Sequence, residues 1–149
     1  MTSTMTHRFV MLAAALSAIA ALIHFIVMPE HFAEWWGYGA FFLVAATAQA
    51  VYALLLLRDR SSWLLWAGMV GNLAIVALWA WTRTVGIPFF GPHAGEVEDI
   101  GAIDVVSKIV EALLIAVLAV LLSADRSPQR EAGSRREPPR RLIRSGRSA

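Results

Sequence analysis

The sequence contains no cysteine and few charged residues. Only 16% of its 149 residues are charged and 58% are hydrophobic, whereas soluble domains carry about 25% charged residues. The absence of cysteine excludes disulfide bonds, iron–sulfur clusters and thiolate metal sites. No nucleophile stands next to a base, and no glycine-rich phosphate loop is present, which weighs against an enzyme. The composition favours a membrane protein instead.

The positive charge that is present gathers at the C-terminal end. Eight of the thirteen basic residues fall within the last 25 positions: Arg126, Arg130, Arg135, Arg136, Arg140, Arg141, Arg144 and Arg147. We therefore expect a transmembrane domain over residues 1–124 and a disordered, arginine-rich tail over 125–149, because the tail has almost no aliphatic residues. The tail is an orientation signal or, alternatively, a contact with anionic lipid headgroups. No aromatic residue is interleaved with its arginines, which argues against nucleic acid binding.

Four apolar segments are long enough to cross a membrane, which takes about 20 residues. They cover residues 9–28, 39–57, 63–82 and 101–124, so the sequence predicts an all-α, four-transmembrane-helix bundle. Pro29 is expected to end the first helix, because proline lacks an N–H donor and clashes with the preceding turn. A cleaved signal peptide is the alternative for the first segment, but its apolar run continues beyond the small residues at 18–20.

The basic residues also predict an orientation. Arg8, Arg58, Arg60 and the tail lie on one side, whereas the other side carries five acids and only Arg83: Glu30, Glu34, Glu96, Glu98 and Asp99. Cationic loops stay in the cytoplasm, so we expect cytoplasmic N- and C-termini and a multi-pass location in the bacterial inner membrane. His31 and His93 then lie outside, and Trp79 belongs to the outer aromatic belt.

Several polar residues fall deep within the apolar segments. Counted at about 1.5 Å per residue, Gln49, Asn72 and Glu111 lie about 13–15 Å from a membrane surface, near the middle of the bilayer. His24, Asp104 and Lys108 lie nearer the outside, at about 6, 5 and 10 Å. Asp104, Lys108 and Glu111 share one helix face and can pair along it. Charge is costly in lipid, so this face must point into the bundle.

These polar residues predict a pocket that opens outward and is closed at the middle. Residues 112–122 are entirely aliphatic, and a continuous channel would need polar lining throughout. A ligand pocket or proton relay is accordingly expected from five residues: Gln49, Asn72, Asp104, Lys108 and Glu111. The structural alternatives are hydrogen bonding between helices for Gln49 and Asn72, and an ion pair that fixes the bundle for Lys108 and Glu111.

A metal site at the outer end is a further hypothesis. The candidate ligands for Zn or Cu are His24, His31, His93, Glu30 and Glu96. No compact motif such as H-E-x-x-H supports them. Ordinary interfacial placement is the alternative for His31 and His93. For His24 the alternatives are a hydrogen bond to Asp104 or to a backbone carbonyl, and proton sensing. Haem binding is not expected, because only His24 lies within a span and no second histidine there could serve as an axial ligand.

Two stretches, "MPEHFAEWWGYGAFF" and "RTVGIPFFGPHAGEVEDIGAIDVVSK", give the chain a resemblance to a group of small four-helix bacterial membrane proteins. The resemblance covers the four spans and implies an architecture without assigning catalytic residues. The leading hypothesis is an integral membrane protein whose outward-facing pocket binds a small ligand or metal ion. The alternatives are a non-catalytic partner subunit of a membrane complex, which includes a homo-oligomer, and a quinone- or proton-linked oxidoreductase component.

Overall fold

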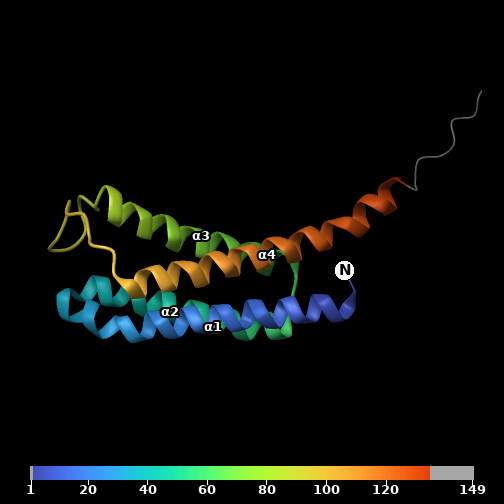
Figure 1. Ribbon diagram of the computed structural model, residues 1–149, viewed down its shortest axis with the longest axis horizontal. Helices are drawn as coiled ribbons and strands as arrows, with labels where there is room; N and C mark the ends of the chain where they lie inside the picture. Colours follow the sequence, from blue (N-terminus) through green and yellow to red (C-terminus); the bar gives the residue numbers. More distant parts are fainter. Residues whose placement is uncertain (1, 135–149) are drawn as a thin grey trace, which may run out of the picture.

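The structure is a computed structural model that describes residues 2–134. Within this range the regular elements are four helices (Figure 1): α1 (Ser3–Glu34), α2 (Trp36–Arg58), α3 (Ser62–Thr84) and α4 (Ala102–Ser134). Each is long and apolar enough to cross a membrane, α4 over Ala102–Ala124. The predicted all-helical fold with four potential spans is therefore confirmed.

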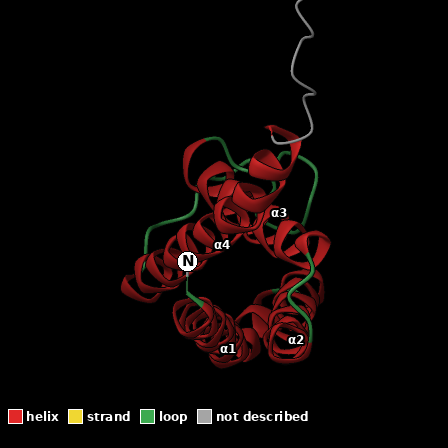
Figure 2. Cartoon of the chain, turned by 90° about the vertical axis from the view of Figure 1, so that its right-hand side faces the viewer, coloured by secondary structure: helices red, strands yellow, loops and turns green. Residues whose placement is uncertain are grey.

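The helices form a bundle in which not all neighbours pack equally. Figure 2 shows α1 and α2 side by side below α3 and α4. α1 packs along α2 and α4, and α4 also packs against α3, whereas α2 and α3 make far fewer contacts with each other. The N-terminus and the end of α4 lie at the same end of the bundle, here called the terminal end (Figure 1). The α1–α2 turn and residues 85–101 form the opposite end, here called the loop end.

α1 does not stop before Pro29, as the sequence analysis expected, but continues through it to Glu34. A proline inside a helix removes one backbone hydrogen bond, and helices that cross membranes tolerate this loss when neighbouring groups satisfy the freed carbonyl. The turn to α2 is a single extended residue, Trp35, with φ −166° and ψ 139°. The rings of Trp35 and Phe32 occupy the space that side chains at Gly37 and Gly39 would need, so this tight turn requires glycine at both positions.

α4 also exceeds its predicted length. It runs from Ala102 to Ser134, ten residues beyond the expected end at 124, so the start of the predicted disordered tail is helical. Residues 135–149, the rest of that tail, lie outside the described residues. The α2–α3 turn is held by Asp59, which accepts hydrogen bonds from the backbone N–H and the hydroxyl of Ser61 at 2.9 and 2.8 Å.

The hydrophobic core lies in the half of the bundle near the terminal end. Its buried residues come from all four helices: Val10, Ala13, Ala14, Leu16, Leu56, Leu64, Leu65, Leu114, Val117, Leu118, Leu121 and Leu122. Tyr52 of α2 packs against this core and reaches Gly68 of α3, where a larger residue would meet the tyrosine ring. The interior of the half near the terminal end is therefore filled by aliphatic side chains. A second, more open pocket lies at the terminal end itself, between the start of α1 and residues 56–60.

Candidate functional site

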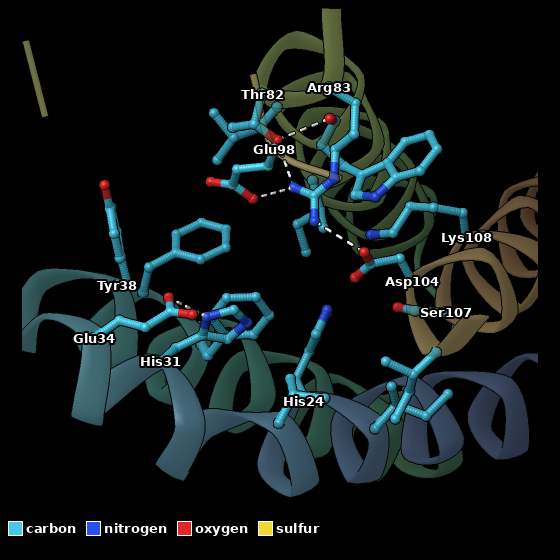
Figure 3. Close-up of a pocket in the computed structure, with 18 of the residues that line it drawn as sticks. His24, His31, Glu34, Tyr38, Thr82, Arg83, Glu98, Asp104, Ser107 and Lys108 are labelled. Carbon is cyan, nitrogen blue, oxygen red and sulfur yellow. Dashed lines mark hydrogen bonds and ion pairs between the residues drawn. The ribbon is translucent and has the colours of Figure 1, made fainter. Parts of the chain in front are cut away.

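A pocket of about 110 Å³ occupies the half of the bundle near the loop end. All four helices and the 85–101 loop line it (Figure 3). Its apolar wall consists of aliphatic and aromatic side chains: Ile23, Val27, Phe41, Phe42, Ile75, Leu78, Ile87, Phe90 and Ile103. Phe90 belongs to the loop and packs edge-on against Trp35 at 4.8 Å between ring centroids, so the loop covers one side of the pocket.

A buried polar layer lies at the inner end of the pocket, between the pocket and the aliphatic core. Each helix contributes one residue: His24 from α1, Gln49 from α2, Asn72 from α3 and Glu111 from α4, none more than 4% exposed. His24 Nδ1 lies 2.9 Å from Gln49 Oε1, and Gln49 Nε2 donates to Asn72 Oδ1 at 3.1 Å. The layer therefore links all four helices at one depth.

His24 lies deeper than the sequence analysis expected. That expectation counted its depth from a helix end at residue 28. Because α1 continues to Glu34, His24 is ten residues from the end, or about 15 Å. This is the depth expected for Gln49 and Glu111, and it explains why His24 contacts them instead of Asp104.

The hydrogen bonds of this layer have a fixed direction. Asn72 Nδ2 donates to the carbonyl of Gly68 at 2.8 Å, and a carbonyl can only accept. The Asn72 oxygen must then accept from Gln49, whose own oxygen accepts from His24, so Nδ1 of His24 carries a hydrogen. Nε2 of a neutral His24 consequently presents a lone pair to Glu111 Oε1, 3.4 Å away. That oxygen has no hydrogen-bond partner among the described residues, although Gln49 and Ser107 are also its neighbours.

The charged residues pair differently from the expected pattern. Lys108 Nζ contacts Glu111 Oε2 at 2.5 Å, one of the two predicted pairs. Asp104 does not pair with Lys108 but with Arg83 of α3, at 2.9 Å, and it also accepts the N–H of Gly101 at 3.1 Å. Arg83 contacts Glu98 as well (Figure 3). Asp104 lies in the first turn of α4, where a carboxylate satisfies a free backbone N–H, and Arg83 reaches it from the end of α3.

The predicted metal ligands are not brought together. His31 pairs with Glu34 at 3.2 Å and stacks on Phe42, whereas His93 pairs with Glu96 at 3.0 Å in the exposed loop. Glu30 is exposed on α1, and His24 lies in the polar layer. Among the side chains that the structure describes, residues 2–124, no three of His, Asp or Glu are grouped so that they could hold a metal ion. The geometry gives the Zn or Cu hypothesis no support.

Two hydrogen-bond donors around the pocket, Trp79 Nε1 and Arg83 Nε, are buried without a partner among the described residues, and the hydroxyl of Ser107 has only the neighbouring Glu111 carboxylate as an acceptor. Ser107 is only 4% exposed. Trp79 was expected in the outer aromatic belt, and Ser107 was not among the expected pocket residues. Their spacing could have pointed to the pocket, because Trp79 lies four residues before Arg83 and Ser107 is next to Lys108.

A search against family models, curated proteins and solved structures returns no match to this chain. The candidate site therefore rests on its own geometry.

Proposed function

We propose that this chain is a multi-pass protein of the bacterial inner membrane whose outward-facing pocket binds a small ligand. In this proposal both termini are cytoplasmic and the loop end faces outward. Support for this direction comes from three basic residues at the terminal end: Arg8, Arg58 as the last residue of α2, and Arg60 in the turn that follows. Cationic segments are retained on the cytoplasmic side.

The observation that carries the proposal is the position of the pocket relative to the core. The pocket lies at the loop end, His24 of the polar layer lines it, and the leucine-rich core fills the bundle toward the terminal end. Leu114 and Leu118, which lie about one and two helical turns after Glu111 on α4, are fully buried. A conducting pore would need polar lining through this region. A pocket that is closed toward the terminal end is suited to binding a ligand and not to conducting one across the bundle.

Cysteine accessibility tests both the pocket and its direction, and the chain contains no native cysteine that would interfere. Phe42→Cys places a thiol on the partly exposed pocket wall beside His24 and His31, and Ser61→Cys places one in the α2–α3 turn. We expect a membrane-impermeant thiosulfonate added to intact spheroplasts to modify the first variant, and to modify the second only after permeabilisation. Leu118→Cys, inside the core, is the control that should react in neither case.

The opposite labelling pattern would reverse the orientation, and an unreactive Phe42→Cys would contradict the open pocket. Native mass spectrometry of protein released from membranes then tests occupancy. The proposal expects one small-molecule adduct on the wild type and none on Ile103→Trp, in which an indole fills the pocket. A second protein chain bound in place of that adduct would instead favour the partner-subunit hypothesis.

A further inference from the structure

The chemistry of the pocket wall restricts what it can bind. The indole N–H of Trp79 and Nε–H of Arg83 are buried at the pocket without acceptors among the described residues, and the hydroxyl of Ser107 has only the neighbouring Glu111 carboxylate as an acceptor. A buried donor without a partner costs about 1–3 kcal/mol. Lys108 adds to them, because its ammonium group has three N–H donors and one is directed at Glu111. The pocket therefore offers hydrogens to a ligand that supplies oxygen acceptors.

The charges around the pocket argue against an anionic ligand. The lining contains two cations, Arg83 and Lys108, and three carboxylates, those of Glu34, Glu98 and Asp104. Both cations are already in ion pairs, Arg83 with Glu98 and Asp104, and Lys108 with Glu111. An anion would thus meet excess negative charge and no free cation. A cationic ligand fits no better, since it has no acceptor for the unpartnered donors and is repelled by their hydrogens.

The remaining surface is apolar and small. Val27, Phe42 and Leu78 come from three different helices and enclose the space beside the donors. The volume of about 110 Å³ is well below the roughly 300–1,000 Å³ of pockets for drug-sized ligands. One compact ring or a short chain suits this space.

We infer that the ligand is a neutral, mainly apolar molecule with a carbonyl-type oxygen, held by a hydrogen bond from Trp79. This inference rests on the proposed function and specifies the ligand class for the same pocket. Quinones and small ketones belong to this class.

Four probes with related methylated rings separate the classes. Duroquinone carries two carbonyls and, being fully substituted, resists addition by nucleophiles. Durene has the same four methyl groups on the ring and no oxygen, 2,3,5,6-tetramethylbenzoate is an anion, and trimethylphenylammonium is a cation. Calorimetric titration of the detergent-solubilised full chain should show saturable binding of duroquinone and at least tenfold weaker binding of the other three.

Two conservative substitutions then locate the contact. Trp79→Phe removes the indole donor and keeps most of the side chain, so it should weaken duroquinone binding about threefold to tenfold. Ser107→Ala removes a hydroxyl that already has Glu111 as an acceptor, so it should have a smaller effect. Durene binding should not change in either variant. Trp63→Phe is the matched control, since Trp63 lies at the other end of α3 and is 66% exposed.

The outcomes separate this inference from the proposed function. Equal binding of durene and duroquinone, preferential binding of the anion or the cation, or no effect of Trp79→Phe would overturn the ligand class. The pocket itself would still stand if Phe42→Cys reacts from outside. No binding of duroquinone would also overturn the inference, and an unreactive Phe42→Cys would then overturn the proposed function with it.

Discussion

Gly68→Ala should destabilise the bundle because this glycine is where α3 approaches α2. A methyl group at position 68 would overlap the ring and hydroxyl of Tyr52. Tyr52 is packed against the core, so its ring cannot move without disturbing aliphatic neighbours. The same glycine supplies the carbonyl that anchors Asn72 and thereby the polar layer.

The magnitude follows from comparison with a second glycine on the same helix. Gly71 lies three residues later, and a methyl group there would meet nothing within 4 Å. Replacing glycine by alanine inside a helix is favourable by up to about 1 kcal/mol, and this gain applies to both sites. Overpacking costs about 1–3 kcal/mol and applies only at Gly68. The two variants should therefore differ in free energy of unfolding by about 1–3 kcal/mol, with Gly68→Ala the less stable.

The assay is reversible unfolding of each variant in mixed micelles with increasing denaturing detergent, followed by circular dichroism. Tyr52→Ala should remove the penalty, so that Gly68→Ala in that background is as favourable as Gly71→Ala. Equal stability of Gly68→Ala and Gly71→Ala in the wild-type background would refute the proposed steric contact between α2 and α3.

Three further predictions concern the core, the polar layer and the α2–α3 turn. Leu114→Ala should cost about 2–5 kcal/mol of unfolding free energy in the same assay, whereas its neighbour Leu113, which is 51% exposed, should be nearly insensitive. Nitrogen-15 NMR of histidine-labelled protein should show a hydrogen on Nδ1 of His24, and a neutral ring with a bare Nδ1 would contradict the hydrogen-bond direction argued above. Hydrogen bonds from Ser61 hold the pKa of the Asp59 carboxyl below its ordinary value. Asp59 therefore stabilises the fold at pH values above its unfolded-state pKa. This stabilisation is lost as the pH falls through the lowered pKa of the folded state. Ser61→Ala should raise the Asp59 pKa in a carbon-13 NMR titration, and an unchanged value would exclude the hydroxyl as a cause.

Properties that depend on one segment at a time could be predicted from the sequence. The four apolar runs and the burial of Gln49, Asn72 and Glu111 follow from the composition of each segment and from its fixed rise per residue. The cost of exposing a charge to lipid was enough to expect that Glu111 faces inward, and its side chain is fully buried.

Other features required knowledge of neighbouring helices. The continuation of α1 through Pro29 depends on whether surrounding groups tolerate a missing hydrogen bond, and it moved His24 into the polar layer. Whether Asp104 pairs with Lys108 or with Arg83 depends on how close the end of α3 lies to the first turn of α4.

The sequence by itself thus determined how many helices form, where Gln49, Asn72 and Glu111 lie along them and which end carries most of the cations, because length, hydropathy and charge act along a single segment. Only the tertiary structure decided which polar atoms meet and which donors remain unpartnered at the pocket. Those contacts depend on the rotation and adjacency of helices, which no local pattern specifies.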